Sequence, residues 1–122
     1  MQQAYPVAAD VVPWVATGFG GGIARCQSVC GAVSGGVMAI GLSRAGQSRD
    51  EALGDILKAA RSLYRSFGEA FQHTDCRQLT GFDFNAPGGY EAFRQSNVRQ
   101  ERCHRYVRFV VKHLWPEGES VS

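Results

Sequence analysis

The sequence predicts one all-α domain over residues 1–122, a small bundle of four or five helices. Two observations carry this prediction. No stretch of the chain alternates apolar and polar residues with the period of two that a half-buried strand requires. Apolar residues recur instead at helical spacing, most clearly through residues 53–71, between residue types that start and stop helices. At 122 residues the chain is long enough to bury one hydrophobic core.

The first two predicted helices are separated by a glycine-rich segment. Asp10 is a suitable cap for a short helix over residues 11–17. Residues 18–22, Gly-Phe-Gly-Gly-Gly, end this helix and form a flexible or tightly turned connection. A second helix is expected over residues 29–44, with Gly46 as its stop.

The third helix has the strongest signals in the chain. Ser48 and Glu51 form the pattern of a capping box, in which each side chain satisfies the other residue's backbone N–H. The helix that follows carries one apolar stripe at helical spacing, which we expect to face the core. The stripe consists of Leu53, Ile56, Leu57, Ala60, Leu63, Phe67 and Phe71.

Two shorter segments complete the predicted fold. Thr74 is a candidate cap for a short helix over residues 75–79, which Gly81 closes. Residues 82–89 are rich in turn-forming residues and predict a loop. A final helix, ended by Trp115-Pro116, carries one apolar face that includes Cys103, Val107, Val110 and Leu114.

Composition excludes several classes of protein. Hydrophobic residues make up 44% of the chain and charged residues 20%, as in ordinary globular domains. The net charge of +2 is too small to predict nucleic acid or a membrane surface as a partner. Residues 26–43 carry no charge, but their polar residues and glycines favour a buried helix over a membrane span. No charged segment precedes an apolar run as in a secretory signal, so we expect a cytoplasmic protein.

The four cysteines are the strongest candidates for chemistry. Thiols stay reduced in the cytoplasm, so the cysteines predict metal binding, redox chemistry or burial before structural disulfides. Cys30 and Cys76 each fall at a predicted helix N-terminus, which stabilises the thiolate that ligates metal or attacks a disulfide. Cys103 lies in mid-helix and by itself is typical of a small buried hydrophobe. Together the three can converge, since each lies on a face or end expected to point inward.

Cys26 and the histidines carry weaker signals. Cys26 lies four residues before Cys30, a spacing that places two metal ligands on one face of a continuous helix; in a turn, their relation is open. No Cys-x-x-Cys pair occurs, which argues against a zinc ribbon or a thioredoxin-type dithiol. His73 and His104 lie near cysteines in the sequence, and ordinary surface or boundary positions are the simpler interpretation.

Glycines shape two further features. Gly31, Gly35 and Ala39 recur every four residues and form a ridge that lets a helix or a cofactor approach the backbone. Close packing in the core is the simpler interpretation of this ridge. Residues 18–22 resemble a phosphate-binding loop, but they lack a preceding strand and the Lys-Ser/Thr of a P-loop, so no nucleotide site is predicted.

Four segments together resemble the C_GCAxxG_C_C family, whose members are assigned to redox or metal chemistry through their cysteines. The segments are residues 18–23 (Gly-Phe-Gly-Gly-Gly-Ile), 30–35 (Cys-Gly-Ala-Val-Ser-Gly), 74–81 (Thr-Asp-Cys-Arg-Gln-Leu-Thr-Gly) and Cys103. The resemblance implies a helical domain with a cysteine cluster, in which Cys30, Cys76 and Cys103 occupy family positions. Relatives usually carry a further cysteine before the glycine-rich turn, and this chain has none before Cys26.

The leading hypothesis is therefore a thiol-based redox or metal-binding protein. Its site is expected to contain Cys30, Cys76 and Cys103, with Cys26 as either a stand-in for the missing cysteine or a spare thiol in a turn. Four thiolates suit an iron–sulfur cluster or Zn²⁺, whereas a metal-free site would be a dithiol–disulfide switch with an unknown redox partner. The alternative is a small helical interaction domain whose cysteines are inert core residues.

A homodimer is also expected. Without an additional helix at the start of the bundle, the ridge of the second helix or the stripe of the third is left partly uncovered. Exposed apolar surface of this kind is usually buried against a partner, and a symmetric homodimer is the commonest arrangement.

Overall fold

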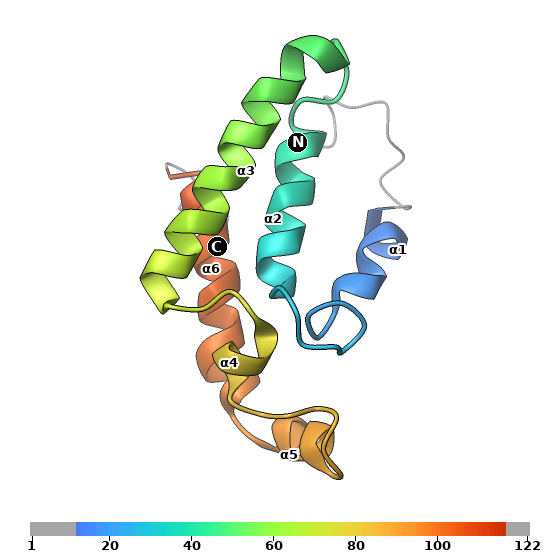
Figure 1. Cartoon of the computed structure of the whole chain (residues 1–122), viewed down its shortest axis with the longest axis vertical. Coiled ribbons are helices and arrows are strands. Elements are labelled where there is room, and N and C mark those ends of the chain that lie inside the picture. Colours follow the sequence, from blue (N-terminus) through green and yellow to red (C-terminus); the bar gives the residue numbers. More distant parts are fainter. Residues whose placement is uncertain (1–11, 117–122) are drawn as a thin grey trace.

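The computed structural model describes residues 12–116. These described residues form six α-helices, four of which have seven or more residues, and no β-strand (Figure 1). The all-α prediction is confirmed. The expected start of the first helix, at Asp10 and residue 11, lies outside the described residues. The helices are α1 (Val12–Ala16), α2 (Gly31–Leu42), α3 (Arg49–Phe71), α4 (Cys76–Thr80), α5 (Gly89–Gln95) and α6 (His104–Leu114).

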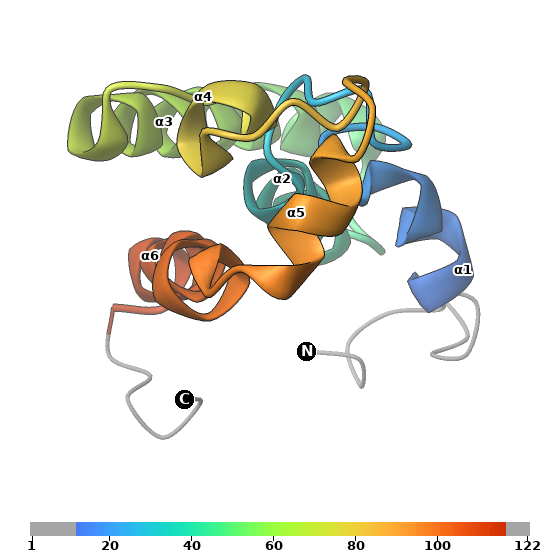
Figure 2. The same ribbon diagram turned by 90° about the horizontal axis from the view of Figure 1, so that it is seen from below.

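The core lies between α2, α3 and α6, which pack against one another. Figure 1 shows these three helices side by side, and Figure 2 shows them turned by 90°; in both views α1 lies beside α2 on the side away from α6. No helix within residues 12–116 is long and apolar enough to span a bilayer. The buried core residues are Val33, Ile40, Leu63, Phe67, Leu79, Tyr106 and Val110.

An aromatic cluster joins α3 to α6 at the end of the bundle where the cysteines lie. The ring of Phe67 contacts those of Phe71, Tyr106 and Phe109 at centroid distances of 4.9 to 5.8 Å, in tilted or edge-on arrangements. Such ring pairs add to the free energy gained by burial. The hydroxyl of Tyr106 donates a 2.8 Å hydrogen bond to the carbonyl oxygen of Leu79, which fixes α4 against α6.

The helix α3 begins where the sequence predicts, but without the predicted capping box. Ser48 occupies the N-cap position, and its side chain makes no capping hydrogen bond. Ser48 and Glu51 are both exposed, so water can satisfy the first N–H groups of the helix in place of these side chains. Asp50 and Glu51 still favour this start, because carboxylates in the first turn interact well with the positive end of the helix dipole.

The buried face of α3 differs in its first half from the predicted stripe. Leu53 and Leu57 are 47% and 55% exposed, whereas Ala52 is 3% exposed and Ile56 packs against the core. Each leucine follows the core-facing residue by one position, which turns its side chain about 100° around the helix. The prediction was wrong for these two leucines and correct for Leu63, Phe67 and the partly buried members of the stripe (Ile56, Ala60 and Phe71).

A similar offset affects the glycine ridge of α2. The predicted ridge contains Gly35, but Gly35 is exposed and a Cβ atom built there would have no neighbour within 4 Å. The buried glycine is Gly36, where a Cβ would lie 2.7 Å from both Leu63 Cδ2 and Val110 Cγ1. Gly36 therefore lets α2 approach α3 and α6 closely.

These two neighbouring glycines give opposite expected effects on stability. Gly36→Ala is expected to lower the free energy of unfolding by about 1–3 kcal/mol, because the added methyl overpacks the core. Gly35→Ala is expected to raise it by up to about 1 kcal/mol, since alanine favours the helix and the methyl points into open space. Urea denaturation of both variants measures the difference, and an equal effect of the two substitutions would contradict this packing.

The helices at the end of the chain depart from the prediction in two places. α5 was not predicted; its start at Gly89 follows Gly88, which adopts a left-handed conformation with φ of 72°. The predicted final helix is preceded by one π-helical turn, η4 (Arg99–Cys103), before α6 starts. Short π-helical turns often occur at functional sites. The end of α6 at Trp115 agrees with the prediction.

Candidate thiol site

Backbone pairing brings Cys30 and Cys76 together. The N–H of Cys30 donates to the carbonyl oxygen of Thr74 at 2.8 Å, and the N–H of Cys76 donates to that of Ser28 at 2.7 Å. These bonds surround an isolated antiparallel bridge between residues 29 and 75. In such pairing, positions 30 and 76 are diagonal neighbours on the same face. The pairing therefore fixes the two thiols beside each other, although they lie far apart in the sequence.

Both cysteines also lie at helix starts, as the sequence predicts. Cys30 is the N-cap residue of α2, and Cys76 is the first residue of α4. The helix α4 starts one residue later than expected, with Asp75 rather than Thr74 at the N-cap position. The αL residue Gly81, with φ of 77°, closes the helix as predicted.

The glycine-rich segment forms a left-handed turn against Cys76. All five residues from 21 to 25 have positive φ, including Ile23 at 68°, Ala24 at 49° and Arg25 at 63°. Positive φ is unfavourable for a residue with a Cβ, most of all for a β-branched one. Gly22, at φ of 71°, has no room for a side chain: a Cβ there would lie 2.6 Å from Ser28 O and 2.8 Å from Cys76 Cβ.

Gln27 anchors this turn, and the sequence analysis did not single it out. Its side chain is buried and bridges to a distant segment: Nε2 donates to the carbonyl oxygen of Phe82 at 2.6 Å, and Oε1 accepts from the N–H of Phe84 at 2.8 Å. Gln27 also forms a hydrogen bond that lowers the pKa of Cys76. In the sequence, this buried role is indicated only by a long polar side chain within an uncharged stretch.

Three of the four cysteines line one cavity of about 670 Å³: Cys30, Cys76 and Cys103. Cys76 is buried, and the other two are partly buried. Cys26 is exposed and does not line the cavity. The structure therefore brings together the three cysteines that were expected to converge. The other walls are formed by the left-handed turn, three aromatic rings and two arginines, namely Phe84, Tyr90, Phe93, Arg25 and Arg99.

The expected histidine neighbours take no part in this cavity. His73 and His104 are both exposed, and neither lines it. Their positions agree with the interpretation of surface residues. The thiol cavity therefore has no histidine to exchange protons with the cysteines, and its proton chemistry rests on the thiols themselves.

Burial raises the pKa of all three cavity thiols. The pKa of Cys76 rises to about 11, because of burial and then of the negative charge of an ionised Cys30. The pKa of Cys103 rises for the same two reasons in the same order, while Arg99 and Arg102 lower it. A charge on Cys30 therefore raises the pKa of both other thiols, and a charge on Cys103 also raises that of Cys76.

The helix N-terminus lowers the pKa of Cys30, as predicted, but burial raises this pKa by more. The backbone N–H groups of Ala32 and Val33 lower the pKa of Cys30, although neither forms a regular capping hydrogen bond with the sulfur. Loss of hydration raises the pKa by more. The net effect is a raised pKa for Cys30, so burial opposes the thiolate stabilisation expected at this helix start.

The raised pKa of Cys76 predicts that alkaline pH destabilises the fold. The thiol titrates near 9.0 in the unfolded chain and near 11 in the folded protein. Between these values the unfolded chain binds fewer protons than the folded one, so the free energy of unfolding falls as pH rises. Guanidinium denaturation at intervals from about pH 8 to 11 measures this fall. Cys76→Ala is expected to make the fall shallower but not to remove it, because burial also raises the pKa of Cys30 and Cys103. A flat profile in the unchanged protein would contradict the assignment.

The donor side chains of the described residues do not gather into a metal site. Within residues 12–116, no group of three or more His, Cys, Asp or Glu side chains is arranged to hold a metal ion. Cys26, the candidate fourth ligand, is exposed and outside the cavity. The described donor atoms are thus not arranged as a four-thiolate site.

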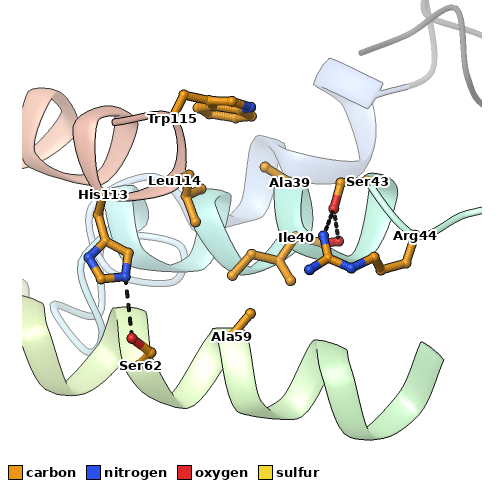
Figure 3. Close-up of a pocket in the computed structure, with 9 residues that line it drawn as sticks. All are labelled: Ala39, Ile40, Ser43, Arg44, Ala59, Ser62, His113, Leu114 and Trp115. Carbon is orange, nitrogen blue, oxygen red and sulfur yellow. Dashed lines mark hydrogen bonds between the residues drawn. The ribbon is translucent and has the colours of Figure 1, made fainter. Parts of the chain in front are cut away.

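A second cavity, of about 290 Å³, lies near the opposite end of α2 (Figure 3). Ser62 Oγ and His113 Nε2 are 3.5 Å apart there, at the limit of a hydrogen bond. Arg44 donates to Ser43 Oγ and pairs with Asp55 at 3.0 Å. Among the described residues, no cysteine or carboxylate lines this cavity, so nothing orients His113 as a catalytic base. The thiol cavity is the better candidate.

The family model described as "Putative redox-active protein (C_GCAxxG_C_C)" matches residues 1–115. The chain belongs to this family. No curated protein and no solved structure matches the chain. In the C_GCAxxG_C_C motif, Gly31 packs against the glycine-rich turn, where a Cβ would lie 3.1 Å from Phe19 O. Membership of the family supports a redox role for the thiol cavity.

Proposed function

We propose that this protein is a thiol–disulfide redox protein in which Cys30 forms a disulfide with Cys76. The observation that carries the proposal is the shared cavity, which Cys30 lines together with both of the other thiols. Cys76 is favoured as the partner because backbone hydrogen bonds hold it beside Cys30. Cys103, at the end of the π-helical turn, is the third thiol of the same cavity.

The reaction is a two-step exchange with a substrate disulfide. Cys30 loses its proton, and its sulfur attacks one sulfur of the substrate, which releases one thiolate and leaves a mixed disulfide. Cys76 then loses its proton and attacks the Cys30 sulfur, which releases the second thiolate. The two released thiolates take up the two protons. In total, two protein thiols are oxidised to one disulfide, and one substrate disulfide is reduced to two thiols.

The electrostatics of the cavity bear on which thiol attacks first. Burial makes each thiolate unfavourable, and a charge on Cys30 makes a second thiolate more so. The N–H groups of Ala32 and Val33 make Cys30 the better attacking thiol, because they partly offset the effect of burial.

The proposal is tested by mapping the disulfide. The protein is oxidised with diamide, its remaining thiols are blocked with a maleimide, and its peptides are identified by mass spectrometry. We expect a cross-link between Cys30 and Cys76, while Cys103 stays free and Cys26 is blocked by the reagent. Four free thiols after oxidation would overturn the proposal and favour a helical interaction domain with inert cysteines.

Metal ligation by Cys30, Cys76, Cys103 and Cys26 is a second proposal. The gathering of three thiols in one cavity supports it, because thiolates are the preferred ligands of Zn²⁺ and of iron–sulfur clusters. Cys26 would have to move into the cavity to complete a four-thiolate site. Zinc and iron analysis with a visible spectrum, after anaerobic purification, tests this; protein free of both metals would count against it.

We also propose that the protein forms a homodimer. Exposed apolar side chains on α2 and α3 support it: Val37 is 38% exposed, and Leu53 and Leu57 are about half exposed. Burying such residues between two copies is a common way to remove them from water. Sedimentation velocity at about 10–50 μM, an ordinary working concentration, is expected to show a dimer, and a monomer at this concentration would contradict a stable one.

A further inference from the structure

The thiol cavity has a charge that the exchange reaction itself does not require. Its charged lining residues are Arg25 and Arg99, and among the described residues no carboxylate lines it. Neither arginine forms an ion pair with a carboxylate of residues 12–116. Two guanidinium groups with no carboxylate partner among the described residues therefore stand beside three thiols, and the cavity is positive.

The two arginines reach the cavity from different elements. Arg25 belongs to the left-handed turn, and its guanidinium carbon lies 4.1 Å from the centroid of the Tyr90 ring. This cation–π contact fixes the direction of an otherwise flexible side chain. Arg99 starts the π-helical turn that ends at Cys103, and its charge lowers the pKa of that thiol. The positive groups thus lie on two walls, one in the turn and one near a reactive sulfur.

The size and the third wall of the cavity suit a small molecule. Its volume of about 670 Å³ lies within the range typical of sites for small ligands. Phe84, Tyr90 and Phe93 form an aromatic wall, with Phe84 in contact with both other rings at 5.2 and 4.9 Å. Such a wall packs against the apolar part of a ligand while the arginines bind its charged ends.

We infer that the substrate of the thiol cavity is a small anionic disulfide, bound through its carboxylates by Arg25 and Arg99. This inference rests on the proposed thiol–disulfide function and adds the chemical class of the substrate. The dithiol form of the protein reduces one such disulfide to two anionic thiols, and Cys30 and Cys76 form the protein disulfide. Two anionic thiols reverse the reaction, so the substrate pair also restores the protein dithiol.

The experiment compares two aromatic disulfides that differ in charge. 5,5′-Dithiobis(2-nitrobenzoate) carries two carboxylates, and 4,4′-dithiodipyridine is uncharged at neutral pH. Rate constants for both are measured by stopped-flow absorbance in a Cys26→Ser background, since the exposed Cys26 would react with either reagent. Arg25→Gln and Arg99→Gln are compared with Arg61→Gln, a matched loss of one charge at an exposed position of α3 outside the cavity.

We expect each cavity substitution to slow the anionic reagent by about 3- to 10-fold, as for a partly exposed charge pair. The uncharged reagent is expected to react at the unchanged rate, which also shows that the variant is folded. Arg61→Gln is expected to change neither rate. In the protein that keeps both arginines, raising the salt concentration to about 0.5 M should slow the reaction with the anionic reagent only. Salt screens the attraction between the arginines and the carboxylates of this reagent.

The outcomes separate the inference from the function on which it rests. If the anionic reagent reacts equally fast with all four proteins, the inference is wrong while the thiol–disulfide function stands. An equal slowing of both reagents would also overturn it, because the arginines would then act on the thiols and not on the charge of the substrate. If neither reagent oxidises Cys30 and Cys76, the proposed function itself fails.

Discussion

Serine in place of Cys30 is expected to abolish the internal disulfide. Backbone hydrogen bonds pair the segment of Cys30 with that of Cys76, so removal of the Cys30 thiol leaves Cys76 without its proposed disulfide partner. The rate of disulfide formation with diamide should fall to background, and blocking with a maleimide should then find every remaining thiol free. This is the largest effect that we predict on the chemistry of the protein.

Cys26→Ser is the matched control for this loss. Cys26 is exposed and outside the cavity, so the variant is expected to form the internal disulfide at the normal rate. The same pair of variants tests whether Cys26 stands in for the missing family cysteine. Metal content that falls in both variants would support the stand-in hypothesis. A disulfide between Cys76 and Cys103 that forms at the normal rate in Cys30→Ser would contradict the central role of Cys30.

Gly22→Ala is expected to lower the free energy of unfolding by about 2–5 kcal/mol. A residue with a Cβ loses about 1–2 kcal/mol in the left-handed conformation, and overpacking adds about 1–3 kcal/mol. The overpacking is specific, because the new atom would meet Ser28 O and Cys76 Cβ at less than 3 Å. The same shift would separate Cys76 from Cys30, so disulfide formation should slow together with the loss of stability.

Gly20→Ala provides a control within the same turn. Gly20 has φ of −60°, which any residue adopts, and a Cβ there would meet only Thr17 O, at an ordinary distance of 3.7 Å. We expect a change of less than about 0.5 kcal/mol, the usual range for a surface substitution away from special features. Thermal unfolding followed by circular dichroism measures both variants. Equal stabilities would contradict the left-handed geometry of the turn.

The helical period predicted the fold class but not which face of each helix is buried. Along α2 and α3 the apolar residues and glycines form broad stripes, and several neighbouring positions fit a core face equally well. The choice of Gly36 over Gly35, and of Ala52 over Leu53, depends on where the partner helix lies. That information comes from residues distant in the chain. The helical period of the apolar residues alone therefore locates the buried face of a helix only to within one residue.

The sequence was sufficient to predict the cysteines of the candidate site but not the residues around them. Helix-start signals and the family motif identified Cys30, Cys76 and Cys103, and the structure places all three in one cavity. Gln27 and Arg25 were missed, because both act through positive-φ backbone and through contacts with segments more than fifty residues away. α5 was missed for a similar reason: its first residue is a glycine preceded by turn-forming residues, so local signals favour a loop.

The left-handed turn also bears on the order in which the molecule assembles. An isolated chain of L-residues does not hold the conformation of residues 21–25, because Ile23, Ala24 and Arg25 together disfavour it by about 3–6 kcal/mol. The turn forms only once Gln27 and the bridge at residues 29 and 75 have partners to bind, and these partners come from the second half of the chain. The helices must therefore dock first. We therefore expect the left-handed turn, which lines the thiol cavity, to form late in folding.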